Sequence, residues 1–214
     1  MSNETLVVWN SALLKSAKLI FPMLIFSVFF AEPIMTCMYG DIYAQSSIYF
    51  VIKNLSGLFY IIPFYPIILA IGKTNSYANA HMIAAFMIVM AEYVVCKTFD
   101  SAVYVAITSE LCKLFKIWLL LRVIANYAHK KITELLPPRP MTILIMISVL
   151  ASLPPFLLLD FLNMNKFIVL FVCLGFFLVD YYVLCWICKV TYRDIAGGFL
   201  KNKSRLNAVV KILP

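Results

Sequence analysis

The stretch SAVYVAITSELCKLFKIWLLLRVIA, residues 101–125, decides how many times this chain crosses a membrane. It is long enough to span a bilayer, but Glu110, Lys113, Lys116 and Arg122 lie within it. A spanning helix needs about 20 mostly apolar residues, and a charge at the centre of the bilayer costs about 2.5–3.5 kcal/mol. Whether this segment crosses therefore has to be judged from the rest of the chain.

The composition is that of an integral membrane protein. Of the 214 residues, 64% are hydrophobic and 13% are charged, and the mean hydropathy is +0.94. A soluble domain has about a quarter of its residues charged, so lipid is the solvent that suits this chain. The apolar runs are continuous and do not alternate, which favours helices over a transmembrane barrel. The net charge of +8 comes with no nucleic-acid-binding motif, and we expect no nucleic acid as a partner.

The distribution of basic residues favours a crossing by residues 101–125. Six segments are apolar enough to span, at 19–38, 50–72, 80–97, 101–125, 141–162 and 167–188. With six crossings, one side holds both termini and most of the basic residues outside the segments, while the other holds only Lys97 and Lys166. Basic residues gather on the cytoplasmic side. The sequence therefore predicts an all-α integral membrane protein with six transmembrane helices and both termini cytoplasmic, in the cell (inner) membrane.

Two flanking segments complete the predicted organisation. Residues 1–18 form an N-terminal interfacial segment with Trp9 as its anchor, and residues 19–190 form the six-helix domain. The apolar stretch 19–38 is too long for a cleaved signal peptide. Residues 191–214 form a basic amphipathic cytoplasmic tail, which suits either an anionic lipid surface or a docking partner. The expected partners are the lipid bilayer and either further copies of this chain or the subunits of a membrane complex.

A faint internal repeat links two parts of the chain. AEYVV at 91–95 matches VDYYV at 179–183 at an offset of 88, and Pro66 meets Pro154 at the same offset. This offset maps the second and third segments onto the fifth and sixth. Two halves of three helices each would be inserted in opposite orientations, as in the 3+3 inverted repeats of many transporters. Coincidence in an apolar sequence is the alternative.

Charges inside the segments are the candidate functional residues. Glu110, Lys113 and Lys116 fall within a 120° arc of one helix at 100° per residue, so their polar stripe should face protein. Glu110 and Lys113 can pair at i,i+3, and Glu92 or Asp180 could balance the remaining charge. The functional interpretation is a pathway that binds an ion or solute or relays protons, with Asp180 paired in role with Glu92. The structural interpretation is a neutralised cluster that locks helices together. We expect Lys53 to lie outside the second helix.

Four prolines in two segments are predicted to interrupt helices. They are Pro63 and Pro66 in the second segment and Pro154 and Pro155 in the fifth. Proline removes a backbone donor, and the carbonyls that it frees need partners inside lipid. Such interruptions line cavities in transporters, although packing alone also accommodates them.

Little in the sequence indicates an enzyme. Cys185 and Cys188 form a C-x-x-C, but at the C-terminal end of a helix the dipole disfavours a thiolate, and packing is the simpler role. The pattern shows no metal site, and we expect no cofactor. The favoured function is a small transporter or channel for an ion or small solute. The alternative is a structural subunit of a larger membrane complex.

Overall fold

A computed structural model describes residues 3–159, 165–188 and 190 of this chain. Within these residues every regular element is a helix, as the sequence predicts. The elements are α1 (Asn3–Phe29), α2 (Ala31–Tyr39), the 3₁₀ helix η1 (Asp41–Ser46), α3 (Ser47–Tyr60), α4 (Phe64–Ala70), α5 (Thr74–Thr98), α6 (Ala102–Ala128), α7 (Ile132–Leu135), α8 (Pro138–Leu158) and α9 (Lys166–Ile187). The predicted tail at 191–214 lies outside the described residues.

Five helical stretches are long and apolar enough to cross a membrane. They are Val8–Phe29, Asp41–Ala70, Thr74–Thr98, Pro138–Leu158 and Lys166–Ile187. The first begins and ends earlier than the predicted 19–38, because α1 runs unbroken from Asn3 and the chain turns at Phe30 before α2. The remaining predicted span corresponds to α6, a 27-residue helix whose internal charges keep it out of this set.

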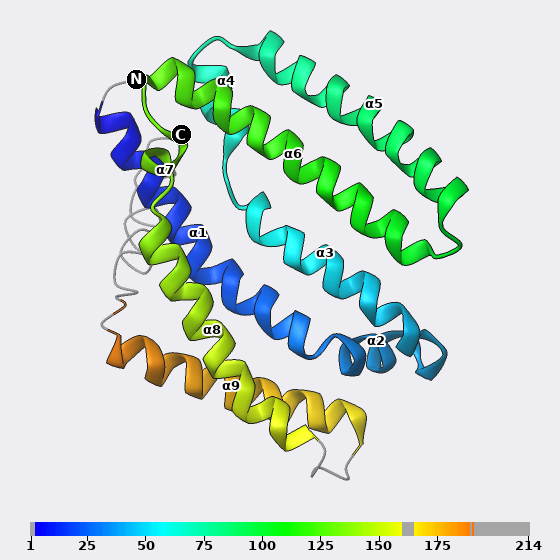
Figure 1. Cartoon of the computed structure of the whole chain (residues 1–214). Coiled ribbons are helices and arrows are strands. Elements are labelled where there is room, and N and C mark those ends of the chain that lie inside the picture. The colour runs from blue at the N-terminus through cyan, green and yellow to red at the C-terminus, as the bar shows by residue number, and fades with distance from the viewer. Residues whose placement is uncertain (1–2, 160–164, 189, 191–214) are drawn as a thin grey trace, which may run out of the picture.

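The long helices lie side by side in one row (Figure 1). Their order across the molecule is α5, α6, α3, α1, α8 and α9, and each packs against its neighbours in that order. Two buried apolar clusters hold the row together. One joins the first half of α1 to α4, α6 and α8 around Leu13, Ile68 and Ile124. The other joins the end of α1 to α8 and α9 around Phe30 and Phe177.

The outer faces of the row are apolar. On α5, Met82 and Phe86 are 70% and 68% exposed, and on α9, Phe171 and Trp186 are 70% and 76% exposed. Contiguous exposure of large apolar side chains is unfavourable in water but natural against lipid tails. The protein is thus an integral membrane protein by both its sequence and its fold. Trp9, the expected interfacial anchor, is 3% exposed and packs within the bundle.

A hydrogen bond between α9 and α1 compensates for a proline that lies inside α1. Pro22 has no backbone N–H, so the carbonyl of Lys18 four residues earlier loses its helical partner. The Tyr181 hydroxyl of α9 donates to this carbonyl oxygen at 3.4 Å. In lipid a freed carbonyl needs such a donor. Tyr93, the residue that matches Tyr181 at the repeat offset of 88, is instead 63% exposed on α5.

The four prolines predicted to interrupt helices behave differently from one another. Pro63 lies between α3 and α4 with φ −80° and ψ 72°, and the helix is interrupted there. Pro66 lies in the first turn of α4, where a missing N–H is tolerated.

Pro154 and Pro155 do not interrupt α8, which continues to Leu158, so the predicted break there is wrong. Pro155 is buried, and the Cys173 thiol of α9 donates to its carbonyl oxygen at 3.5 Å. This contact joins α8 to α9 at the proline pair. Only one of the two segments matched by the repeat is interrupted, and the repeat stays a prediction.

Substitution of Gly57 provides a test of the close packing between α3 and α1. A Cβ on Gly57 would meet Leu24 Cδ1 at 3.3 Å, whereas a Cβ on Gly175 of α9 meets nothing within 4 Å. We expect Gly57→Leu to destabilise the bundle by about 1–3 kcal/mol because it forces α3 away from α1. Gly175→Leu is the matched control and should leave stability unchanged or raise it. Thermal unfolding in a mild detergent measures both, and equal melting temperatures would contradict this packing.

Candidate functional site

The Glu110 carboxylate is the polar centre between α3 and α6. Glu110 is 8% exposed in a helix that is otherwise mostly apolar. The Ser56 hydroxyl donates to its Oε2 at 2.6 Å, and the Lys113 ammonium donates to its Oε1 at 2.8 Å. Lys53 Nζ lies 3.3 Å from Oε1, and the Tyr60 hydroxyl lies 3.3 Å from Oε2. We name these five residues the Glu110 cluster.

The spacing of residues along two helices explains the cluster. Lys53, Ser56 and Tyr60 follow each other at i, i+3 and i+7 on α3, which places them on one helical face. That face lies against α6, where Glu110 and Lys113 are one turn apart. The Glu110–Lys113 pair predicted from the sequence is confirmed.

The sequence prediction missed the three α3 residues. Lys53, which was expected to lie outside its helix, is within α3, although its side chain is 62% exposed. Their i, i+3, i+7 spacing in an apolar segment was the signal that could have indicated them.

Positive charge is in excess around the cluster. Lys53 and Lys113 share the single carboxylate of Glu110. Lys116 lies one turn beyond Lys113, and among the described residues no carboxylate comes within 4.0 Å of its ammonium. On α6, Glu110 therefore pairs with Lys113 at one end of the polar stripe, whereas Lys116 at the other end has no counterion among the described residues.

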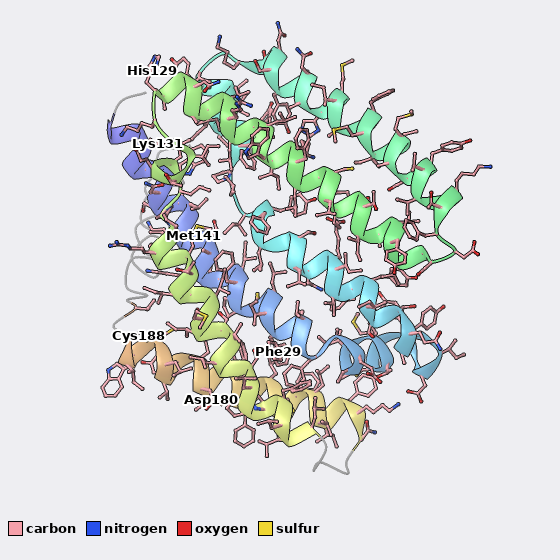
Figure 2. The ribbon with its side chains drawn as sticks, viewed as in Figure 1. Phe29, His129, Lys131, Met141, Asp180 and Cys188 are labelled. Carbon is pink, nitrogen blue, oxygen red and sulfur yellow. The ribbon has the colours of Figure 1, made fainter. Side chains whose placement is uncertain are left out.

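Glu92 and Asp180 do not supply the missing negative charge. Glu92 is half-buried on α5, and Asp180 is half-buried on α9. Neither makes an ion pair with another residue in the described ranges. The two carboxylates lie on helices at opposite edges of the row, as Figures 1 and 2 show. The structure therefore does not bring them into one site.

A cavity of about 280 Å³ lies beside the interruption between α3 and α4. Lys116 and His81 are its basic side chains, and Tyr60 joins it to the Glu110 cluster. The Tyr77 ring lies 4.4 Å from the His81 ring and 5.7 Å from the Tyr65 ring, centroid to centroid. We name it the α3–α4 cavity. Its lining among the described residues is Tyr60, Ile62, Pro63, Phe64, Tyr65, Pro66, Tyr77, His81, Lys116, Ile117 and Leu120.

This cavity lies at the middle of α6. Lys116 is close to the midpoint of the 27-residue helix, about 20 Å from either end at 1.5 Å per residue. A cationic side chain at this depth is costly unless water, protein or a ligand solvates it. The cavity supplies the room for such a ligand.

A second, larger cavity lies at the other end of the bundle. Its volume is about 500 Å³, and its charged lining residues are Glu32, Asp41 and Lys166. Asp41 and Lys166 form an ion pair with each other, and both are exposed. This cavity lies at the helix ends, where water can solvate its charges.

The C-x-x-C does not form a redox pair in this structure. Cys185 is 2% exposed and packs in the cluster shared by α1, α8 and α9, whereas Cys188 is exposed at the end of α9 (Figure 2). No disulfide joins them. Among the residues that the structure describes, no group of three or more histidine, cysteine or acidic side chains could hold a metal ion.

Glu110 should contribute strongly to the stability of the bundle. Glu110→Ala removes the carboxylate acceptor of the buried Ser56 hydroxyl and leaves two lysines without their shared carboxylate, and we expect a loss of about 2 kcal/mol. Glu92→Ala removes a half-buried carboxylate that has no ion pair in the described region, and should cost less than about 0.5 kcal/mol. Thermal unfolding in detergent measures the difference. An equal effect of the two substitutions would show that the cluster does not bind α3 to α6.

Comparison with known proteins gives no match for this chain: no family model, no curated protein and no solved structure. Its function has to be inferred from its own charges, its interrupted helix and its cavities.

Proposed function

We propose that this chain is a six-span protein of the cell (inner) membrane that binds a small solute or ion and moves it across the bilayer. The observation that carries the proposal is the α3–α4 cavity, which lies beside an interrupted helix and contains the uncompensated ammonium of Lys116. Interrupted backbone at membrane depth occurs where it is buried in protein or lines an aqueous cavity. Many secondary transporters bind their substrates at such interruptions near the bilayer midplane.

A continuous series of polar groups supports a path through the protein. Lys53 is exposed at the middle of α3 and contacts Glu110. Glu110 contacts Tyr60, and Tyr60 lines the cavity that contains Lys116 and His81. These groups extend over about two turns of α3 and of α6, which run side by side (Figure 1). A solute that reaches Lys53 would find polar partners as far as the middle of α6.

The packing of α6 supports a crossing by this helix. Its charged stripe is turned toward α3 and the cavity, so lipid meets mainly its other faces. α6 lies along the whole length of α5, which is itself apolar enough to span (Figure 1). With α6 as a crossing, both termini fall on the side rich in lysine and arginine, which is the cytoplasmic side.

A second candidate function is a structural subunit of a membrane complex, and the exposure of α5 favours it. Only 11% of the most apolar stretch of α5 is buried, against 33% for α1 and for α8. α5 packs on α6 and, less extensively, on α4. A partner helix could cover this face. Purification from native membranes in mild detergent distinguishes the two candidates, because a subunit should retain a partner in fixed ratio and a carrier should not.

Thiol accessibility tests the solute path. In a variant whose six native cysteines are replaced by serine or alanine, Ile117→Cys places a thiol in the cavity wall. We expect a membrane-impermeant thiol reagent to modify it, because thiols react as thiolates, which form in water.

Phe115→Cys is the matched control. It lies two residues away at nearly the same depth, is 36% exposed and lines none of the cavities described above, so it should resist modification in the bilayer. Failure to modify Ile117→Cys from either side of the membrane would rule out an aqueous path through this cavity.

The topology has a direct test. Reporter fusions at residue 214 and near residue 164 should report cytoplasmic and external positions respectively. The physical reason is the concentration of basic residues in the connections and tails that share a side with the C-terminus. A C-terminus on the external side would show that the number of crossings is odd or that the orientation is reversed.

A further inference from the structure

We propose that the α3–α4 cavity binds a small organic monoanion with an aromatic body, of the benzoate class, with its carboxylate on the Lys116 ammonium and its ring among the tyrosines. This inference rests on the proposed solute-binding function and names the class of solute. It is carried by three features of the cavity, namely its charge, its walls and its size.

The charge of the cavity selects an anion. Lys113 is already held by Glu110 at 2.8 Å, and Lys53 shares the same carboxylate. Lys116 has no such counterion within the described residues, and the other ionisable base in the lining is His81. Within the part of the chain that the structure describes, no acidic side chain lines the cavity. An anionic ligand would provide the charge that Lys116 lacks, whereas a cation would meet a site of like charge.

The walls of the cavity select an apolar, planar body. Ile62, Phe64, Ile117 and Leu120 form its apolar surface. Tyr65 and Tyr77 meet edge to face at an interplanar angle of 65°, and the Tyr77 ring also packs against the His81 ring. Aromatic rings arranged in this way favour another ring in offset or edge-to-face contact. A strongly hydrated inorganic anion would lose its water here and gain few polar partners in return.

The size of the cavity limits the ligand. Its volume of about 280 Å³ is close to the lower bound of about 300 Å³ for small-molecule sites. A single ring with one carboxylate fits these dimensions.

The experiment measures the melting temperature of the full-length purified protein in detergent, in chloride-free sulfate buffer at constant ionic strength, as each probe is titrated. The probes are benzoate, its neutral analogue benzamide, and chloride. We expect benzoate to raise the melting temperature in a saturable manner, because a ligand that binds only the folded state stabilises it. Benzamide and chloride at the same concentrations should have at least tenfold weaker effects.

Two substitutions on α6 locate the binding. Lys116→Gln should weaken benzoate binding at least tenfold, because it removes the charge on which the carboxylate rests. Arg122→Gln is the matched control: it removes a positive charge from the same helix, but Arg122 lies outside the cavity lining and packs over Trp118 at 5.2 Å. It should leave benzoate binding unchanged. In the Ile117→Cys variant, bound benzoate should also slow modification by the impermeant thiol reagent.

Several results would overturn the inference. An equal response to benzamide would show that the charge is not recognised, and an equal response to chloride would show that the aromatic body is not. Undiminished benzoate binding by Lys116→Gln would place the anion elsewhere. No benzoate binding, with Ile117→Cys still accessible to the thiol reagent, would refute this solute class and leave the aqueous path standing. Loss of both would refute the proposed function as well.

Discussion

The shared carboxylate of Glu110 is the interaction on which one half of this structure depends. It accepts from Ser56 and Lys53 on α3 and from Lys113 on its own helix, so it joins α3 to α6 inside the apolar row. Lipid tails are as apolar as the helix surfaces, and apolar faces alone therefore give α6 little reason to pack in one orientation. A charged group excluded from lipid does give a reason. By turning the stripe of α6 inward, the cluster also places Lys116 at the α3–α4 cavity.

Prolines have different effects on the helices in the two halves of the row. In the half formed by α1, α8 and α9, both α1 and α8 run through their prolines. The Tyr181 hydroxyl donates to the Lys18 carbonyl that Pro22 frees, and the Cys173 thiol donates to the Pro155 carbonyl. In the half formed by α3 to α6, the chain leaves the helical conformation at Pro63, and a cavity lies beside the interruption. At the prolines themselves, the first half is closed by packing between helices, whereas the second half has a cavity beside its interruption. This asymmetry is what makes the second half the candidate for solute binding.

The charges follow the same division. Lys53, Glu110, Lys113 and Lys116 all belong to α3 and α6, while α1, α8 and α9 meet through aromatic and small residues such as Phe26, Ala151 and Cys173. Stacked rings at the end of α1, with Phe26 and Phe30 centroids 4.4 Å apart, belong to the buried cluster that α1 shares with α8 and α9. The excess of ammonium over carboxylate in the half formed by α3 to α6 makes an anion the natural occupant of the α3–α4 cavity.

The sequence by itself determined the helical class, the membrane as solvent and the pairing of Glu110 with Lys113, because each depends on composition or on spacing within one helix. It also indicated that the stripe of α6 should face protein. Only the tertiary structure decided which helices are neighbours, and so that Lys53, Ser56 and Tyr60 complete the site while Glu92 and Asp180 lie apart at opposite edges. It also decided that Pro63 interrupts its helix and Pro154 does not. The physical reason is that periodicity fixes which residues share a face, whereas the neighbour that meets this face depends on buried contacts and hydrogen bonds between helices distant in sequence.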